Sequence, residues 1–245
     1  SFDIRLTVLD AAPGVGVWAN RDFASFLSHE AGFAGAQEGL SASRGLDILR
    51  QDALAAGENA ILVDNLAIRG AAGLTGSFAL AEGLLRASLR GGAAFDLRLN
   101  AGDNLAEGNE GANVIDGLRG ADRLYGRGGD DLLSGGAGND SLWGDAGRDR
   151  LDGGAGDDNA WGGAGTDVFV FMDGDGGMRA RDFARGEDRI EVAGCAGIDS
   201  FADLIAAATV QWTPDRAILT LSGERLEIFG VAQAQGLGAD LFVFA

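Results

Sequence analysis

The sequence has no lysine, one histidine, one cysteine and two prolines among its 245 residues. Without lysine, neither a phosphate-binding P-loop nor a Schiff-base mechanism is available. His29 precedes Glu30, but the second histidine of an H-E-x-x-H zinc protease is missing, and no serine lies in a G-x-S-x-G nucleophile elbow. The commonest catalytic motifs are therefore absent. Cys195 has no partner for an internal disulfide and is expected to be a buried spectator.

Long apolar segments and positive charge are also scarce. No run of eighteen apolar residues occurs, so no membrane span is expected. Residues 1–16 show no basic region followed by an apolar core, so no Sec-type leader is expected. The formal net charge of -18 and the pI of about 4.2 argue against nucleic acid as a partner.

Glycine, by contrast, is abundant, and between residues 108 and 170 it follows a nine-residue period. Seven registers begin at Gly108, Gly117, Gly126, Gly135, Gly144, Gly153 and Gly162, and glycine also fills the fourth place of each. The sixth place holds Asn113, Asp122, Asp131, Asp140, Asp149, Asp158 and Asp167. The eighth place holds Ile115, Leu124, Leu133, Leu142, Leu151, Ala160 and Phe169, of which Ala160 is the weakest. Each register predicts a glycine-rich turn followed by a short strand with one inward apolar residue, a pattern that a disordered linker would not need.

These registers resemble the RTX nonapeptide G-G-x-G-x-D-x-U-x of haemolysin-type calcium-binding secreted proteins. The resemblance implies an all-β fold, a calcium-stabilised parallel β-roll in which two nonapeptides make one coil. Calcium, a hard cation that takes carboxylate and carbonyl oxygens, would lie between stacked turns. The implied carboxylate pairs are Asp122 with Asp140, Asp131 with Asp149, Asp140 with Asp158, and Asp149 with Asp167.

By the same resemblance, backbone carbonyls complete each site, from the second and fourth places of the earlier turn and the first and third places of the later turn. For the pair Asp122 and Asp140 the carbonyls are those of Leu118, Gly120, Gly135 and Ala137, and for Asp131 and Asp149 those of Arg127, Gly129, Gly144 and Ala146. For Asp140 and Asp158 they are those of Gly136, Gly138, Gly153 and Ala155, and for Asp149 and Asp167 those of Asp145, Gly147, Gly162 and Ala164. We therefore expect about four well-formed calcium sites.

The repeat departs from the motif in a few places. The second place holds Asn109, Leu118, Arg127 and Asp145 instead of glycine, so these turns are expected to be strained although their carbonyls remain. Asn113 replaces the first aspartate, so the site it would share with Asp131 is expected to be weaker or empty. Residues 99–107 keep only Gly102, Asn104 and Leu105 in phase, which predicts a degenerate first turn.

The ninth place of every second register is aromatic, with Tyr125, Trp143 and Trp161. These side chains are predicted to form a ladder on one face of the roll, with rungs about 4.8 Å apart, the spacing of neighbouring strands. Two interpretations stay open. Either a terminal segment covers the ladder, or it is a docking surface for a second copy, a partner protein or a glycan.

The C-terminal third is similar to the segment that follows the roll in serralysin-type and other type I-secreted proteins. Residues 173–176 and 181–190 carry that similarity, and residues 240–245 repeat the pattern of residues 167–171 at the chain end, where family export signals lie. Asp199 or Ser200 is expected to cap a short helix carrying Phe201, Leu204 and Ile205. Strands are expected at residues 209–212, 217–221 and 225–229, with turns at Pro214 and Gly223. Whether Asp173 and Asp175 hold a further ion is left open.

Residues 1–98 give weaker signals. Period-two runs at 2–8 and 95–99 and apolar stretches at 60–63 and 77–80 predict mostly β-structure, with short helices allowed at 21–28 and 46–54. Acidic residues are available for a carboxylate pair of a glycosidase or lyase, although solvated surface is the simpler interpretation. The candidates are Asp22, Glu30, Glu38 and Asp47.

Together these patterns predict an N-terminal mostly-β domain (1–98), an RTX β-roll (99–171) and a C-terminal β-rich cap with a type I secretion signal (172–245). We expect a secreted, extracellular or cell-surface calcium-binding protein that leaves through the type I secretion apparatus and folds on meeting calcium outside the cell. We expect it to be non-enzymatic and to serve self-assembly or attachment. The alternative is a small secreted polysaccharide-active enzyme with the roll as its export and folding module.

Overall fold

The computed structural model describes residues 94–245 continuously. Before them it describes Gly92 and the strands β1 (Thr7–Leu9), β2 (Gly16–Trp18), β3 (Asn59–Val63), β4 (Leu66–Gly70), β5 (Gly76–Ala79) and β6 (Arg86–Arg90). The helices allowed at 21–28 and 46–54 lie outside the described residues, as do His29 and the candidate carboxylates Asp22, Glu30, Glu38 and Asp47. Strands β3 and β5 confirm β-structure in the stretches at 60–63 and 77–79.

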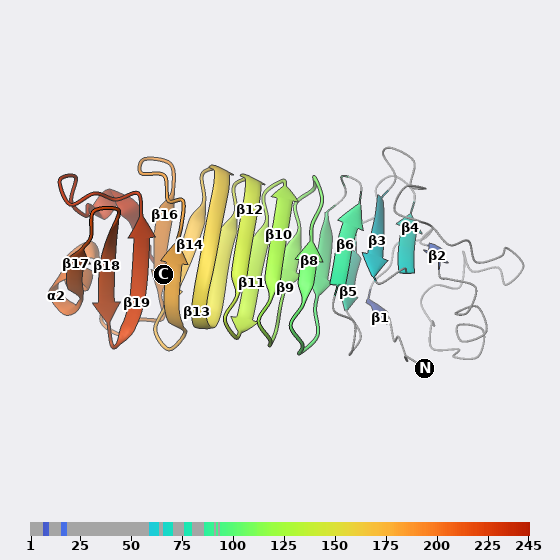
Figure 1. The fold of residues 1–245 in the computed structure, drawn as a ribbon, viewed down its shortest axis with the longest axis horizontal. Helices are drawn as coiled ribbons and strands as arrows, with labels where there is room; N and C mark the ends of the chain where they lie inside the picture. The colour runs from blue at the N-terminus through green and yellow to red at the C-terminus, as the bar shows by residue number, and fades with distance from the viewer. Residues whose placement is uncertain are drawn as a thin grey trace, which may run out of the picture.

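The repeat forms a parallel β-roll, an elongated stack in which strands lie side by side along the long axis of the molecule (Figure 1). Its strands are β7 (Phe95–Arg98), β8 (Leu105–Glu107), β9 (Val114–Asp116), β10 (Arg123–Gly128), β11 (Leu132–Ala137), β12 (Ser141–Gly147), β13 (Arg150–Gly165) and β14 (Val168–Met172). Alternate strands form two facing ladders, sheet A through β7, β9 and β11 and sheet B through β8, β10 and β12. The long strand β13 takes part in both ladders.

Within the repeat each residue pairs with the residue eighteen positions further on. Leu124 pairs with Leu142 in sheet B, and Leu133 pairs with Leu151 in sheet A. This register confirms that two nonapeptides make one coil. As a result, the same place of the motif stacks directly on itself from turn to turn.

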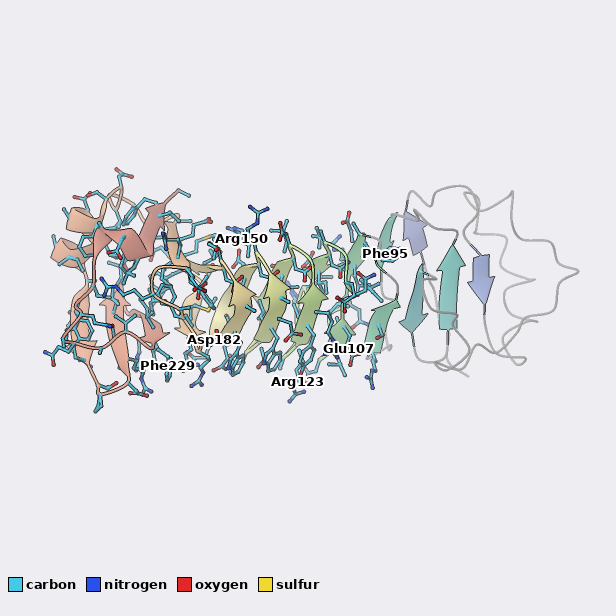
Figure 2. The ribbon with its side chains drawn as sticks, turned by 90° about the horizontal axis from the view of Figure 1, so that it is seen from above. Phe95, Glu107, Arg123, Arg150, Asp182 and Phe229 are labelled. Atoms are coloured by element: carbon cyan, nitrogen blue, oxygen red, sulfur yellow. The ribbon has the colours of Figure 1, made fainter. Side chains whose placement is uncertain are left out.

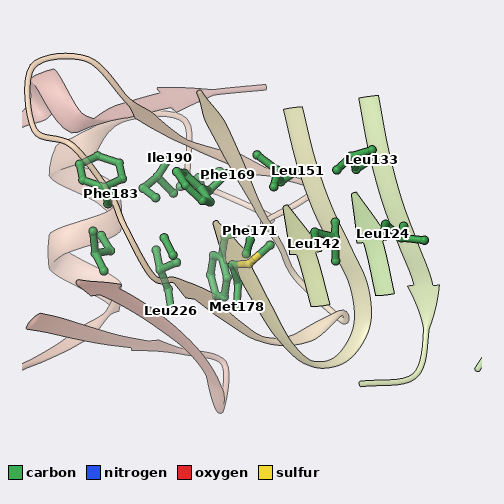
Figure 3. Packing of buried hydrophobic residues seen from close by; sticks show 14 of the residues in the cluster. Leu124, Leu133, Leu142, Leu151, Phe169, Phe171, Met178, Phe183, Ile190 and Leu226 are labelled. Atoms are coloured by element: carbon green, nitrogen blue, oxygen red, sulfur yellow. The ribbon is translucent and has the colours of Figure 1, made fainter. Parts of the chain in front are cut away.

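The core is the narrow space between the two sheets, filled by the eighth-place side chains. All seven, from Ile115 to Phe169, are at most 2 % exposed. Figure 3 shows them in two rows, with Leu133, Leu151 and Phe169 in one and Leu124 and Leu142 in the other. Ala160, which pairs with Leu142 in sheet B, supplies little volume to the core. In Figure 3 the larger Phe171 and Met178 lie beyond Leu142. Burial of these side chains stabilises the roll by about 25 cal/mol for each Å² of apolar surface removed from water.

The parallel pairing continues on both sides of the predicted roll. Towards the N-terminus β6 stacks on β8 and β5 stacks on β7, so the strand pairing crosses residue 98 without a break. Beyond it, β1, β3, β4 and β2 add antiparallel neighbours. Whether the first 98 residues fold as a unit of their own stays a prediction.

Towards the C-terminus both ladders extend past residue 171. Sheet A adds β16 (Arg189–Ala193) and then β20 (Phe242–Phe244), while sheet B adds β15 (Gly176–Ala180) and β19 (Glu224–Phe229). Phe169, Ile190 and Phe242 therefore lie in one inward file. The pattern that residues 240–245 share with residues 167–171 thus corresponds to two strands of the same sheet.

The remaining elements of the C-terminal cap follow the sequence closely. Ser200 caps α2 (Phe201–Ala207) by accepting a hydrogen bond from the Asp203 backbone N–H at 3.3 Å. In this helix Leu204 is buried, whereas Ile205 is 37 % exposed. An antiparallel β17 (Thr209–Trp212), β18 (Arg216–Leu221) and β19 complete sheet B, and a short 3-10 turn, η3 (Ala239–Leu241), precedes β20. Among the described residues no helix has the length and apolarity needed to cross a membrane.

Candidate metal centre

The turns between strands have a backbone that stacked glycines make possible. The second place has a positive φ in six turns, at Leu118, Arg127, Gly136, Asp145, Gly154 and Gly163. The fourth place has one at Gly120, Gly129, Gly138, Gly147, Gly156 and Gly165. Three second-place residues are not glycine, and Leu118 (φ 71°) and Arg127 (φ 80°) hold a conformation that costs an L-residue about 1–2 kcal/mol. The strain expected at these positions is therefore present, except at Asn109, whose φ is not positive.

The sixth-place carboxylates form two buried files along the turns. Asp122, Asp131, Asp140, Asp149, Asp158 and Asp167 are each at most 1 % exposed. In each of them Oδ1 accepts a hydrogen bond from the backbone N–H of the sixth-place residue eighteen positions earlier, at 2.7–2.9 Å. The pairs expected from the sequence, such as Asp140 with Asp158, are thus brought into direct contact through the backbone of one and the side chain of the other.

The second carboxylate oxygen, Oδ2, is the unusual atom of the file. It is buried and accepts no hydrogen bond from any described residue in Asp122, Asp131, Asp140, Asp149 and Asp167. A buried carboxylate oxygen without a partner costs several kcal/mol unless it is protonated or faces a cation. Each of these aspartates therefore needs a proton or a positive charge on its inner side.

A backbone carbonyl converges on the same place in four turns. At Gly135, a Cβ would collide with Asp140 Oδ2 and with the Gly153 carbonyl oxygen, so both oxygens lie over the missing side chain. Three other first-place glycines are covered in the same way by one Oδ2 atom and one carbonyl oxygen. The pairs are Asp122 with the Gly135 carbonyl, Asp131 with the Gly144 carbonyl and Asp149 with the Gly162 carbonyl. All four first-place carbonyls of the implied ligand sets are accordingly next to their aspartate.

The other carbonyls of those sets lie between successive turns, although part of their hydrogen-bonding capacity is used there. The second- and fourth-place oxygens of Leu118 and Gly120 face the glycines of the next turn, Gly136 and Gly138. Ala137 N–H donates to the Leu118 carbonyl at 2.8 Å, and the Ala137 carbonyl accepts from Gly120 N–H at 2.9 Å. A carbonyl oxygen has a second lone pair, so these contacts leave one acceptor position per oxygen.

The donor set is therefore mixed. Within the described ranges, no three carboxylate, imidazole or thiol groups gather closely enough to hold an ion alone. One orphaned carboxylate oxygen, a second carboxylate and several carbonyls form a hard, all-oxygen environment, which suits calcium. The residues thus fit the ion that the motif implies.

Comparison with known proteins agrees with this geometry. The family of RTX calcium-binding nonapeptide repeats matches the chain in four copies, over residues 99–133, 107–142, 134–169 and 143–177.

The chain carries RTX calcium-binding repeats.

Among solved structures, this chain is similar to the extracellular lipase LipA from Serratia marcescens, with 17 % identity and a TM-score of 0.33. That match covers 61 % of this chain but only 40 % of the lipase. The AlgE6R3 subunit of the Azotobacter vinelandii mannuronan C5-epimerase is 27 % identical with a TM-score of 0.30, over 62 % of this chain and 78 % of that subunit. No curated protein matches the sequence.

In the calcium-free roll, burial raises the pKa of the sixth-place aspartates. It raises the pKa of Asp131 to about 8, of Asp122 to about 7 and of Asp149 to about 6. It also raises the pKa of Asp158 and Asp167 to about 7 and shifts that of Asp140 upward. The accepted backbone N–H lowers each pKa, and neighbouring carboxylates such as Asp140 beside Asp122 raise it again. Calcium bound at these oxygens would therefore compete with protons.

The predicted aromatic ladder of the RTX roll is confirmed in its geometry. Tyr125 and Trp143 stack with ring centroids 4.4 Å apart, and Trp143 and Trp161 stack at 4.7 Å, both with planes 5° apart. Arg127 lies over the Tyr125 ring at 5.5 Å and Arg181 over the Trp161 ring at 5.9 Å. The ring faces are thus used within the stack, and all three aromatics are half-buried, which leaves ring edges rather than faces for a partner.

Two aspartates of the RTX roll's C-terminal end were missed from the sequence. Asp188 ends one carboxylate file, because its Oδ1 accepts from Asp167 N–H at 3.0 Å. Its signal was present, since residues 186–191 keep the fourth to ninth places of the motif. Asp182 accepts from the N–H groups of Gly162 and Gly163 at 2.8 and 3.0 Å, a contact across twenty residues that no periodicity indicates.

Ionic contacts hold the cap to the RTX roll, and these were not predicted either. Arg150 pairs with Glu191 at 2.8 Å on the outer face of sheet A, and Figure 2 shows Arg150 projecting on the side opposite Arg123. In the cap, the buried Glu227 contacts Arg179, Arg216 and Arg225 at 3.4, 2.9 and 3.1 Å. Asp173 is exposed and Asp175 is only partly buried.

Proposed function

We propose that this chain is a secreted calcium-binding protein whose roll binds about four calcium ions and completes its folding when it meets them. The observation that carries the proposal is the set of buried, unpartnered Oδ2 atoms in Asp122, Asp131, Asp140 and Asp149, each beside a first-place carbonyl. Bound calcium would supply the positive charge that these oxygens lack. Its ligands would be the carboxylate pairs and the first-, second-, third- and fourth-place carbonyls described above.

The proposal includes a coupling between binding and folding. Stacked carboxylates in two files repel one another, and the acidic chain has an overall charge of -18. A cation that binds the folded roll but not the unfolded chain stabilises the fold in proportion to its saturation. Extracellular calcium modules typically have dissociation constants of roughly 10⁻⁴ to 10⁻³ M. Such sites would stay empty at low cytosolic calcium and fill outside the cell, which supports export of an unfolded chain through the type I apparatus.

We further propose a non-enzymatic role in self-assembly or cell-surface attachment. The support comes from residue types: the single histidine and the missing lysine leave few ways to build a catalytic centre. The stacked ladder contributes no open aromatic platform for a sugar ring, because its ring faces pack on each other. The role in assembly would therefore lie elsewhere than on the ladder faces.

Far-UV circular dichroism combined with light scattering tests these points while calcium is raised from chelator to about 10 mM, above the range expected for extracellular modules. The calcium proposal predicts a cooperative gain of β-signal with a midpoint below the final concentration, and assembly predicts large particles in the same range. No spectral response would refute the calcium-coupled fold. Turnover of any member of a panel of acidic polysaccharides would refute the non-enzymatic role.

A further inference from the structure

Two consecutive turns at the N-terminal end of the roll share a sequence that the aspartate turns lack. Residues 100–104 and 109–113 both read N-x-G-x-N, nine residues apart. The second asparagine of each occupies the sixth place of the motif, where the later turns carry aspartate. The first asparagine occupies the second place, where the later turns have a positive φ.

In the turn at 109–113, the asparagines close the turn from within. Asn109 Oδ1 accepts a hydrogen bond from Gly111 N–H at 2.8 Å, and Asn109 N–H donates to Asn113 Oδ1 at 2.9 Å. Asn109 does not adopt the positive φ of Leu118, whose N–H instead donates to Asp116 at 3.2 Å. The inward direction of the Asn109 N–H is thus a property of this turn's own backbone.

The turn at 100–104 repeats the same two bonds. Asn100 Oδ1 accepts from Gly102 N–H at 2.9 Å, and Asn104 Oδ1 accepts from Asn100 N–H at 3.3 Å. Two independent turns with one sequence and one bonding pattern indicate a defined local structure rather than a decayed repeat.

The closed turn fills the position that calcium needs in the other turns. Asn113 Oδ1 and the Gly126 carbonyl oxygen are the nearest oxygens to Gly108, as Asp140 Oδ2 and the Gly153 carbonyl are to Gly135. In five of the six aspartate turns this inner side-chain oxygen is buried without a hydrogen-bond donor among the described residues. In the asparagine turn a backbone N–H already occupies one lone pair of this oxygen, and the neutral amide carries no charge that would attract a cation to the other.

The closed turns also need no counter-ion. Their sixth-place groups are neutral amides that are almost fully buried, so calcium-free folding brings no like charges together there, although Asn113 Nδ2 has no acceptor among the described residues. In addition, Asn104 and Asn113 each donate their backbone N–H to the first carboxylate of a file, Asp122 or Asp131, at 2.7 Å. They therefore position the Oδ1 atoms on which the next turns are built.

We propose that the two N-x-G-x-N turns are calcium-independent end turns, which fold without the ion, bind none, and hold the first aspartate of each file in place. A comparable bond closes the opposite end of one file, where Ala184 N–H donates to Asp188 Oδ2 at 2.7 Å. The inference rests on the proposed function only where it assigns calcium to the aspartate turns. The hydrogen bonds that close the two N-x-G-x-N turns do not depend on the proposed function.

Hydrogen exchange of the full chain in EDTA and in calcium tests the inference directly. Backbone amides of residues 95–116 should exchange at least about tenfold more slowly than those of residues 117–167 in EDTA, and calcium should protect mainly the latter. Equal exchange of both segments in EDTA would overturn the closed turns. If calcium protects neither segment, the proposed function fails, while slow exchange of residues 95–116 would still support the closed turns.

A gain-of-site variant tests the role of the asparagines. Asn109→Gly combined with Asn113→Asp removes the inward bond and restores the motif, so the folded variant should bind one more calcium ion than the parent, measured by calorimetry and by metal analysis. Asn139→Asp is the matched control, because this exposed fifth-place side chain gains the same charge away from the inner position. An unchanged ion count in the folded double variant would overturn the inference, as would an equal gain in the control.

Discussion

At the scale of single residues, the position of one oxygen decides what each turn can bind. In the aspartate turns Oδ1 is fixed by the backbone of the turn below, so Oδ2 is forced inward against a first-place glycine. Only glycine leaves room there for two converging oxygens. Under the proposed function, the first place would therefore be part of the calcium site even though it contributes no side chain.

Gly135→Ala tests this use of space. The new Cβ would collide with Asp140 Oδ2 and the Gly153 carbonyl oxygen, so the variant should lose at least one calcium ion and about 1–3 kcal/mol of stability in calcium. Calorimetry and urea unfolding measure the two effects. Gly92→Ala is the control, since no described residue lies within 4 Å of its Cβ position. Unchanged calcium binding by the Gly135 variant would contradict the assignment of this site.

Leu118→Gly addresses the strained second place. Because Leu118 has φ 71°, glycine should relieve strain and raise the unfolding free energy by about 1 kcal/mol in saturating calcium. Asn109→Gly should instead destabilise, because that turn has no positive φ and loses the bond to Gly111. Thermal or urea unfolding of both variants gives the comparison, and a loss of stability on Leu118→Gly would show that the turn is not strained.

At the scale of elements, the nine-residue period predicts the roll because each place serves one function on every turn. Sixth-place carboxylates, eighth-place apolar residues and ninth-place aromatics all stack as that period requires. The cap strands Thr209–Trp212, Arg216–Leu221 and Glu224–Phe229 also follow from alternation and turn residues. Local pattern suffices wherever the partner of a residue lies at a fixed distance in sequence.

Pattern fails where the chain interrupts its own spacing. The stacking offset grows to twenty residues between β13 and β15, as Ala160 pairs with Ala180, and to twenty-one between β14 and β16. β19 and β20 join the ladders only after much longer excursions. The contacts of Arg150 with Glu191 and of Glu227 with its three arginines depend on these returns, so no sequence period indicates them.

The aromatic stack yields a prediction for an element rather than for a site. Trp143 contacts a ring on each side, and each stacked pair contributes about 0.5–1.5 kcal/mol, so Trp143→Ala should destabilise the roll by about 1–3 kcal/mol. The calcium count should not change. Near-UV circular dichroism should lose the signal of the coupled rings, whereas Ser134→Ala, at the same place on the opposite sheet, should leave it intact. Loss of calcium ions in the Trp143 variant would contradict a purely packing role.

At the scale of the whole molecule, the two files of buried carboxylates link stability to pH in opposite ways with and without calcium. Burial raises the folded-state pKa of Asp122, Asp131 and Asp158 to about 7, 8 and 7, above the ordinary value of 3.8. Without calcium, the folded chain therefore binds more protons than the unfolded chain between pH 3.8 and about pH 8. Stability is therefore greatest near pH 4 and is lost as the pH rises to about 8.

Urea unfolding at pH 5 and pH 8 measures this linkage. In EDTA the roll should be more stable at pH 5. In saturating calcium the order should reverse, because the ion binds the ionised carboxylates and protons displace it. Equal stability at the two pH values in EDTA would show that the aspartates are not buried together in the calcium-free chain.

The number of calcium ions bound per chain tests the central claim most directly. The full chain, dialysed against millimolar calcium and freed of unbound ion, would be analysed for metal and protein content together. The structure predicts about four ions, one for each turn in which an orphaned Oδ2 meets a first-place carbonyl, and Asp140→Asn should lower that number. A folded chain that retains no calcium, or one whose count is unaffected by Asp140→Asn, would contradict the assignment of these turns as the metal centre.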